Sequence, residues 1–463
     1  MATPSLGWEL QSRENAPPDA REKNLFEGEW PLLSREEKQL LEDVLDHFYA
    51  LSAEKQTEKG LSELLAEYCE EHSILLSREQ NADLSLVLTH HALAAGPLTP
   101  LLNNSSLEEI SISGIGRAHV VRTYHIHHGW VNTPLFFTDE NTLITLLNRL
   151  VLASGKRLSA QTPILNAPLS SGQRLHASIY PVCPSRVEAC IRKYVVRATH
   201  PNELVSTHVM PPEAFAYLSI ALQSDCNMLI VGNTGSGKTT TLNALLGSLP
   251  REERMIVVEE TPELHLAHEH VVRLLSSSGE NATMSALIRE TLRMRPDRVV
   301  VGEIRFPEEA KAFMESVLAG QGKGTYATFH GHSAAEALSR LRQFGLVESD
   351  LAWVNILVVQ RRWSERNAEG KIRDVRGVSE IVELTHTTDG RNASWIIRTI
   401  FGWDSTQRKL VEKNPSVLVR EKFAWCFPSR EFEEEYSRET SAFKLEEKKH
   451  SHHASKKSRS VRA

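Results

Sequence analysis

A complete phosphate-binding loop is the feature that most constrains this chain. Residues 232–240 read GNTGSGKTT, with two glycines, a lysine and a threonine at the spacing that such loops require. The apolar run MLIV precedes the loop and TLNALLGSL follows it, so a strand and a helix flank it in the required order. Backbone N–H groups of such a loop point at phosphate oxygens, and the helix N-terminus adds partial positive charge. The sequence therefore predicts an α/β fold that binds a nucleoside triphosphate.

The residues of the loop are the predicted nucleotide ligands. They are Gly232, Asn233, Thr234, Gly235, Ser236, Gly237, Lys238, Thr239 and Thr240. Lys238 is expected to bridge the terminal phosphates, and the Thr239 hydroxyl to hold Mg²⁺. A glycine-rich turn that matches the motif by chance is the alternative, and the two correct flanking elements weigh against it.

The composition excludes several classes of protein. The chain has 463 residues, enough for about two to four domains, and its net charge of -6 argues against a nucleic-acid coat protein. Its five cysteines form no close CxxC pair, which indicates neither a disulfide framework nor a zinc site and suits a reducing cytoplasm. No signal pattern opens the chain and no run approaches the ~20 apolar residues of a membrane span. We therefore expect a soluble protein whose membrane role, if any, is peripheral.

Changes of composition along the chain predict six segments. The helical region begins at Ser34, which forms a capping box with Glu37 before a periodic apolar pattern. The segments are a flexible leader (1–33), a helical N-terminal region (34–100), a smaller α/β domain (101–197), a linker (198–206), a nucleotide-binding domain with a C-terminal extension (207–430) and a charged, disordered tail (431–463).

The nucleotide-binding domain is expected to contain a parallel sheet covered on both faces. Apolar, β-branched runs alternate there with helical patterns, which is typical of such sheets. We expect strands in the runs MLIVG, MIVVEE, VVRLL, RVVVGEI and TYATFH. A helix is expected in TMSALIRETLRM, and Pro296 ends it.

Three polar groups follow these strands at their carboxyl ends, where open α/β sheets bind ligands. Glu259 and Glu260 end one strand, where they could orient an attacking water or hold Mg²⁺ through water. Glu303 ends another strand next to Gly302, which allows close approach, and His330 ends a third, where it could sense the γ-phosphate. Each group alone is common at strand ends, but their order behind a complete phosphate-binding loop favours a joint site.

These motifs together resemble the hexameric ATPases of type II and type IV secretion systems, which drive pili, the archaeal flagellum-like motor and macromolecule export. GNTGSGKTT, VVEETPEL, LRMRPDRVVVGEIR and GTYATFHGHSAAEALSRL are similar to the family's four motifs. LLNNSSLEEISISG looks like the start of the family's N-domain, and PILNAPLSSGQRLHASIYP looks like the segment that joins it to the motor. VSEIVELTH and TIFGWDSTQRKLVEKNPSVLVREKFA are similar to the C-terminal region of archaeal members.

The resemblance implies a RecA-like motor domain that follows a smaller α/β N-domain and a helical region. It also implies hydrolysis of ATP, with Mg²⁺, by a homohexameric ring. In this interpretation Glu303 is the catalytic carboxylate and contributes to the metal site with Thr239. Glu259 and Glu260 form the acidic box, and His330 is the histidine of the third box.

Two arginines and three departures from the family pattern complete the comparison. Arg174 and Arg192 lie in segments that look like the domain-joining region, so they are candidates for reaching the nucleotide across a subunit boundary.

Gln321 follows Gly320 where the family often has a second histidine, and His332 replaces a small or acidic residue. The cysteine-bearing metal module of many bacterial type II members is missing, which argues against that branch.

The resemblance also implies a partner and a location. The partner would be a membrane platform protein that moves pilin or filament subunits, and the ring would lie peripherally at the cytoplasmic face of the cell membrane. The alternatives are an ATPase of a conjugative or effector-exporting type IV system, a nucleic-acid translocase and a non-enzymatic nucleotide sensor. The sequence offers no aromatic and basic stripe for stacking nucleic-acid bases.

Two histidine groups raise a separate metal hypothesis. They are His125, His127 and His128, and His265, His268 and His270. His125 and His127 would share one strand face, but no cysteine or carboxylate follows at ligand spacing. Solvated or stacked histidines are the preferred interpretation.

Overall fold

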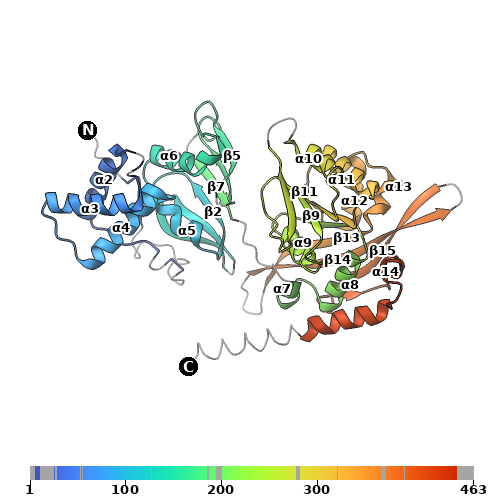
Figure 1. The fold of residues 1–463 in the computed structure, drawn as a ribbon. Coiled ribbons are helices and arrows are strands. Elements are labelled where there is room, and N and C mark those ends of the chain that lie inside the picture. Colours follow the sequence, from blue (N-terminus) through green and yellow to red (C-terminus); the bar gives the residue numbers. More distant parts are fainter. Residues whose placement is uncertain are drawn as a thin grey trace, which may run out of the picture. The chain divides into compact units, whose positions relative to one another are not determined.

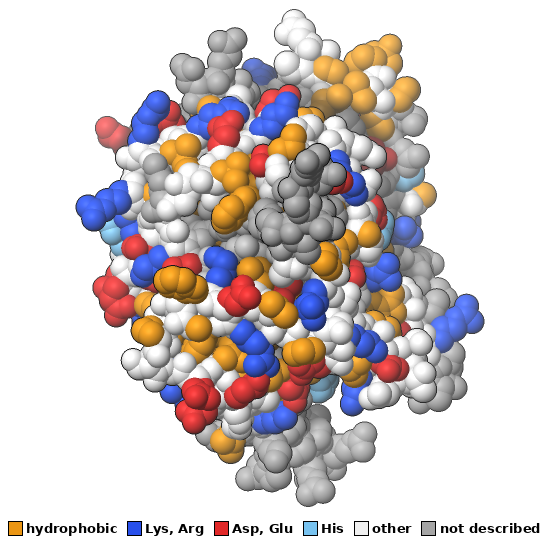
Figure 2. Space-filling model, turned by 90° about the vertical axis from the view of Figure 1, so that its right-hand side faces the viewer, with side chains coloured by type: hydrophobic (Ala, Val, Ile, Leu, Met, Phe, Trp, Pro, Cys, Tyr) orange, Lys and Arg blue, Asp and Glu red, His pale blue; other side chains and the backbone are white. Residues whose placement is uncertain are grey.

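The chain divides into two compact units, Met1–Val195 and Val196–Ala463 (Figure 1). The computed structural model describes residues 6–10, 25–26, 29–52, 54, 56–126, 128–170, 172–184, 187–193, 201–277, 282–320, 322–366, 372–389 and 392–445. In these ranges no helix has both the length and the apolar character that crossing a membrane requires. Acidic and basic side chains are interspersed over the face shown in Figure 2.

Three capped helices form the helical part of the first unit. They are α2 (Arg35–Ala50), α3 (Glu58–Glu71) and α4 (Arg78–Leu93). Their N-cap residues Ser34, Thr57 and Ser77 each accept a hydrogen bond from the backbone N–H three residues later, which satisfies a donor that the helix leaves unpaired. The capping box predicted for Ser34 and Glu37 is confirmed.

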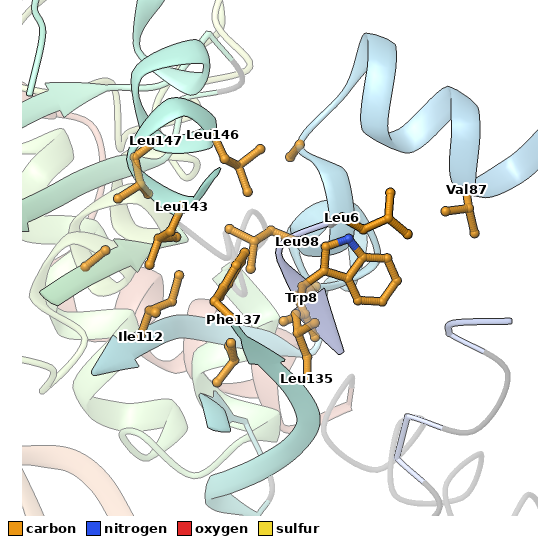
Figure 3. Packing of buried hydrophobic residues seen from close by; sticks show 14 of the residues in the cluster. Leu6, Trp8, Val87, Leu98, Ile112, Leu135, Phe137, Leu143, Leu146 and Leu147 are labelled. Carbon is orange, nitrogen blue, oxygen red and sulfur yellow. The ribbon is translucent and has the colours of Figure 1, made fainter. Parts of the chain in front are cut away.

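A seven-stranded antiparallel sheet follows, in the order β1-β4-β3-β2-β7-β6-β5. Its strands are β1 (Trp8–Leu10), β2 (Leu107–Ser113), β3 (Val120–His125), β4 (Gly129–Phe137), β5 (Ile164–Pro168), β6 (Arg174–Ser178) and β7 (Glu188–Arg192). The amphipathic helix α6 (Glu140–Leu150) packs its leucines into the same core as Ile112, Leu135 and Phe137 of the sheet (Figure 3). Six of these strands, β2 to β7, and α6 lie within residues 101–197, for which the sequence predicts a smaller α/β domain.

The structure differs from the expected flexible leader at residues 6–10. There β1 pairs with β4 at the edge of the sheet, with Trp8 opposite Phe137. Leu6 and Trp8 are buried in the core of the first unit (Figure 3), and the Trp8 indole Nε1 donates to His91 Nε2 at 3.1 Å. Burial of two large apolar side chains explains why this short segment is held.

The second unit contains a nine-stranded sheet in the order β10-β9-β11-β12-β8-β13-β14-β15-β16. The strands are β8 (Met228–Gly232), β9 (Arg254–Glu259), β10 (His270–Leu275), β11 (Arg298–Ile304), β12 (Gly324–Phe329), β13 (Ile356–Arg366), β14 (Ile372–Asp389), β15 (Asn392–Asp404) and β16 (Lys409–Glu412). The five predicted strands are confirmed as β8 to β12, and they pair in parallel with one another and with β13.

An antiparallel extension, β13 to β16, was not predicted. The 18-residue strand β14 belongs to two hairpins, because Ile372–Glu383 pairs with β13 and Glu380–Asp389 pairs with β15. Since β13 runs parallel to β8, the strand ends Arg366 and Ile372 lie on the side of the carboxyl ends of the parallel strands. The strand ends Asp389 and Asn392 lie on the opposite side, and Figure 1 shows the strands β14 and β15 projecting there from the second unit.

Helices cover both faces of this sheet, as expected. They are α7 (Pro201–Ser206), α8 (Pro212–Gln223), α9 (Lys238–Leu246), α10 (Met284–Thr291), α11 (Pro307–Ala319), α12 (Ala334–Gln343), α13 (Glu348–Leu351) and α14 (Leu418–Cys426). One buried cluster joins α8, α9 and α14 to the sheet, and a second joins α10, α11 and α12 to it.

Two boundaries differ from the expected ones. Residues 201–206 of the expected linker form α7, and residues 194–200 lie outside the described part of the chain. Residues 432–445 of the expected disordered tail are helical, with Phe443 4.6 Å from Phe215 between ring centroids. Apolar side chains spaced along that helix explain its packing. The remainder of the tail, residues 446–463, is outside the described part.

Candidate nucleotide-binding site

The loop between β8 and α9 has the backbone that a phosphate cradle needs. Gly235 and Gly237 have φ values of +73° and +96°, which lie in the left-handed region that glycine adopts without strain. Gly232 is required for a different reason, because a Cβ there would lie 2.3 Å from the Gln360 backbone oxygen. The sequence thus uses glycine where the chain turns sharply or meets another strand.

The polar residues of the loop take different positions. Thr234 is exposed, whereas Thr239 and Thr240 are half-buried in the first turn of α9. The Asn233 side-chain oxygen accepts a hydrogen bond from the Arg362 backbone N–H at 3.3 Å. Ser236 is fully buried, and its hydroxyl oxygen has no hydrogen-bond partner among the described residues.

Lys238 is a buried cation that the loop itself surrounds. Its Nζ donates to the backbone oxygens of Gly232 at 3.1 Å and Asn233 at 3.4 Å. It also lies 3.8 Å from Oε1 of Glu303. Carbonyl groups of a flexible loop are weaker partners than phosphate oxygens, so the ammonium group is suited to exchange them for a polyphosphate.

Glu303 meets Lys238 and His330 at the carboxyl ends of three neighbouring strands. β12 lies between β8 and β11, which explains why His330, just after β12, stands between the loop and Glu303. His330 Nε2 lies 2.8 Å from Glu303 Oε1, and Arg305 Nε donates to Glu303 Oε2 at 2.6 Å. The predicted juxtaposition of Lys238, Glu303 and His330 is therefore present.

The charges around Glu303 keep its carboxylate ionised. Burial alone raises the pKa of Glu303, but the hydrogen bond from His330 and the charges of Arg305 and Lys238 outweigh it and lower the pKa to about 2. A carboxylate that is ionised at neutral pH can accept a proton from water or hold a hydrated cation.

Glu259 and Glu260 are neighbours in sequence with different environments. Glu259 is buried, and its Oε1 accepts the backbone N–H groups of Glu263 and Leu264, each at 2.9 Å, while Oε2 accepts Arg273 Nη1 at 2.8 Å. Burial raises the pKa of Glu259, and these hydrogen bonds act in the opposite direction. Its side chain packs against Gly302, where a Cβ would lie 3.1 Å from Glu259 Cγ.

Glu260 is exposed and forms an ion pair with Arg305. Arg305 therefore bridges the carboxylates of Glu260 and Glu303. This arrangement connects the expected acidic box to the expected catalytic residue through a single guanidinium group. Their catalytic assignments remain predictions.

Arg174 and Arg192 lie in the first unit, whereas the other predicted site residues lie in the second. They are opposite each other on the neighbouring strands β6 and β7. Arg174 is half-buried and Arg192 is exposed. The two arginines therefore form one pair on the first unit, and a role for them at the nucleotide remains a prediction.

Four side chains that contact the loop or the predicted carboxylates were missed as individual candidates: Arg273, Arg305, Gln360 and Arg362. Arg305 could have been found, because it follows Glu303 within the run that carries the motif. Gln360 and Arg362 could not, because they reach the loop from β13, more than a hundred residues later, by strand pairing alone.

The site fits a nucleotide and Mg²⁺ by its donor set. The glycines leave a cradle that a Cβ would fill, Lys238 supplies a buried cation, and the oxygen atoms of Thr239 and Glu303 are of the kind that would hold Mg²⁺. Elsewhere in the described residues, no group of three His, Cys, Asp or Glu side chains is arranged to hold a metal. In the first histidine group, the rings of His125 and His128 lie 4.7 Å apart between centroids, and His127 is outside the described part of the chain. Gln321, at the position where the family often has a second histidine, is also outside the described part.

In the second histidine group, His265 and His270 contact protein atoms, whereas neither ring nitrogen of His268 has a hydrogen-bond partner among the described residues. His265 Nδ1 lies 3.0 Å from the Glu263 backbone oxygen, and the His270 ring contacts Arg254. Burial is the main cause that lowers the pKa of His268. The five cysteines of the chain are free thiols.

Comparison with known proteins gives a family for most of the chain. Residues 91–398 match the family described as "Type II/IV secretion system protein". An uncharacterized protein of Methanocaldococcus jannaschii is 28% identical over 365 residues, which are 76% of this chain and 64% of that protein, so this chain spans less than two thirds of its length. VirB11 of Agrobacterium fabrum is 30% identical over 286 residues, which are 55% of this chain and 80% of that protein.

A solved structure shows similarity over a comparable part of the chain. The VirB11 ATPase of the Brucella suis type IV secretion system, in complex with sulphate, is 24% identical, with a TM-score of 0.31. The similarity covers 62% of this chain and 92% of that one. The fold class expected from the sequence is confirmed by the sheet topology and the family: a RecA-like α/β unit follows a smaller α/β unit with a helical region before its sheet.

Proposed function

Because this chain belongs to the type II/IV secretion system protein family, we propose that it is an ATP-hydrolysing motor of such a system. The observation that carries the proposal is the meeting of Lys238, Glu303 and His330 at the edge of the parallel sheet. Phosphoryl transfer to water requires an oriented water and neutralised phosphate charge more than covalent chemistry. The Glu303 carboxylate would orient the water, and the Lys238 ammonium group, 3.8 Å away, would neutralise phosphate charge.

Each group has a distinct role in the proposed reaction. Lys238 leaves its loop carbonyls and binds the terminal phosphates, while the loop N–H groups bind phosphate oxygens. Glu303 orients the attacking water and accepts its proton, and His330 holds the Glu303 carboxylate in place. Thr239, with Glu303 through water, would hold Mg²⁺, which neutralises phosphate charge when bound.

The test of this chemistry is Glu303→Gln. The amide keeps the size of the side chain but cannot accept the proton, so we expect nucleotide binding to persist while turnover falls by about 100-fold or more. Binding of a fluorescent ATP analogue and steady-state phosphate release measure the two effects. Glu315→Gln is the matched control, because Glu315 pairs with Arg289 on the exposed surface. Near-normal turnover of Glu303→Gln would contradict the assignment.

The motor would act as a homohexameric ring that drives filament assembly in a type IV pilus or archaellum-like machine. Sequence similarity of the C-terminal region to archaeal members supports this branch. ATP binding and hydrolysis would close and release the two units as rigid bodies. A membrane platform protein would receive this motion, and it would hold the ring peripherally at the cytoplasmic face of the membrane.

The second candidate is a motor of a conjugative or effector-exporting type IV system, which the similarity to VirB11 favours. Capture from native membranes with the ATP-loaded Glu303→Gln variant separates the two candidates. Recovery of a pilus-type platform protein supports the first, and recovery of conjugative components supports the second. A nucleic-acid translocase is disfavoured, because the sequence offers no aromatic and basic stripe for stacking nucleic-acid bases. Several-fold stimulation of turnover by single-stranded DNA would reverse that ranking.

A further inference from the structure

Strand β13 supports the phosphate-binding loop from the side. Gln360 pairs with Gly232 in parallel register, so β13 continues past the point where β8 ends. Two residues later, the Arg362 backbone N–H donates to the Asn233 side chain at 3.3 Å. The Arg362 guanidinium lies over Gly235, where a Cβ would be 3.1 Å from its Nη1. One residue therefore contacts the loop through both its backbone and its side chain.

Asp374 fixes the orientation of that guanidinium group. Arg362 Nη2 forms an ion pair with Asp374 Oδ2, and Ser364 donates its hydroxyl to Asp374 Oδ1 at 3.0 Å. Ser364 and Asp374 are opposite each other on β13 and β14, so the hairpin itself holds the carboxylate. One nitrogen of the guanidinium group thus faces the loop while the other is bound to the strands.

The buried underside of the loop does not provide the same support. Ser236 Oγ and Gln360 Oε1 are both buried, and neither has a hydrogen-bond partner among the described residues. The Asn233 side chain is hydrogen-bonded to β13 through the Arg362 backbone N–H, whereas the Lys238 hydrogen bonds to Gly232 and Asn233 stay within the loop. The contacts made by Arg362 are therefore a large part of what fixes the loop to the sheet.

We propose that Arg362 and Asp374 are a positioning pair that holds the phosphate-binding loop in its binding shape and so sets the affinity for nucleotide. Two left-handed glycines make the free loop conformationally costly to order, and a loop ordered in advance binds more tightly. A planar guanidinium can bridge the loop and the carboxylate at once, whereas an ammonium group cannot. This inference rests on the proposed nucleotide binding.

The experiment is a double-mutant cycle of Arg362→Gln and Asp374→Asn in the full chain. We expect each variant to weaken binding of a fluorescent ATP analogue by about tenfold and to raise KM similarly, with kcat within about twofold. The double variant should be no weaker than either single variant, because both changes break one bridge. Arg362→Lys should behave like Arg362→Gln.

The matched controls are Arg408→Gln and Glu365→Gln. Arg408 Nη2 lies 2.8 Å from Glu365 Oε1, so this is an arginine and carboxylate pair that also involves β13. We expect nucleotide affinity to be unchanged in both controls. The midpoints of urea unfolding show whether each variant remains folded. If Arg362→Gln does not fold, Asp374→Asn still tests the pair.

Three outcomes would overturn the inference. One is tighter nucleotide binding by Asp374→Asn together with weaker binding by Arg362→Gln. That result would indicate that the charges of the two side chains act directly on the nucleotide and that the pair does not position the loop. The second is full rescue by Arg362→Lys, and the third is unchanged affinity in Arg362→Gln while the wild type binds nucleotide. Failure of the wild type to bind nucleotide would instead overturn the proposed function together with this inference.

Discussion

At the scale of single residues, the site depends on how Glu303 is kept ionised while half-buried. Its two oxygens have different partners: His330 and Lys238 are near Oε1, and Arg305 is bound to Oε2. Desolvation opposes ionisation, so these partners must supply the compensation. The same contacts that prepare the carboxylate for chemistry therefore also contribute to folding stability.

This linkage predicts a pH dependence. The pKa of Glu303 is lowered to about 2 in the folded chain from a usual value near 4.5, so the unfolded chain binds the proton more readily. The contribution of Glu303 to stability should be complete above about pH 4.5 and should disappear as the pH falls towards 2. Urea unfolding of wild type and Glu303→Gln at several pH values measures it. A difference in stability between the two that is independent of pH would contradict the prediction.

The sequence predicted residues that belong to contiguous motifs and missed those that reach the site through pairing. Lys238, Glu303 and His330 each end a recognisable apolar strand or follow a glycine loop, so their meeting could be expected. Arg273 and Arg362 carry no local signal, because their partners Glu259 and Asp374 come from other strands. Such contacts depend on the register in which strands far apart in the sequence pair, and this register cannot be read from a single sequence.

At the scale of elements, β11 is fixed at the end opposite to Glu303. Arg298 begins that strand and is only 1% exposed, yet it donates to Glu253 and to the Tyr326 hydroxyl. Its Nη1 also donates to the backbone oxygens of Leu222 and Lys323. The arginine therefore ties β11 to the chain on both sides of it, which helps to place Glu303 at the other end.

Arg298→Met should be strongly destabilising. Removing one partner of a buried ion pair leaves Glu253, which is 6% exposed, with Lys323 as its remaining cation. We expect a loss of about 3 to 5 kcal/mol in the free energy of unfolding. Arg289→Ala is the control, since Arg289 and Glu315 form an exposed pair that contributes less than about 1 kcal/mol. Urea denaturation measures both, and equal losses in the two variants would contradict the argument.

Elements with strong patterns could be predicted, and elements that depend on tertiary packing could not. The parallel strands β8, β9, β11 and β12 are largely buried apolar runs, which explains why they were found, and the edge strand β10 was found from its apolar, β-branched sequence although it is less buried. The sixth parallel strand, β13, was not predicted. β1 has three residues and depends on pairing with β4. The strands β13 to β16 mix charged and apolar residues, so their sequence does not separate strands from connecting loops.

At the scale of the whole molecule, the predicted site residues are divided between the two units. The loop, Glu303 and His330 belong to the second unit, and Arg174 and Arg192 belong to the first. An arginine supplied across a subunit boundary can increase phosphoryl-transfer rates by about 10³ to 10⁵. Such an arrangement would make hydrolysis depend on assembly.

Arg174→Ala is expected to lower turnover more than nucleotide affinity. If Arg174 acts across a boundary, random mixing with Glu303→Gln chains should restore roughly a quarter of the wild-type rate, because that fraction of interfaces would keep both groups. Phosphate release by co-assembled rings measures the restoration. Arg192→Ala is tested in the same way. No restoration on mixing would place the arginine in its own chain's site or in a structural role.

The length of β14 has a mechanical consequence. Eighteen residues of extended chain span roughly 60 Å, and backbone pairing to β13 or β15 stiffens nearly all of that span. Its first half carries Asp374 beside the phosphate-binding loop, and its second half ends in the hairpin that projects from the far side of the sheet. A small tilt at the nucleotide end would produce a larger displacement at that distant tip, so in the motor that we propose this tip would be a point through which motion is passed on.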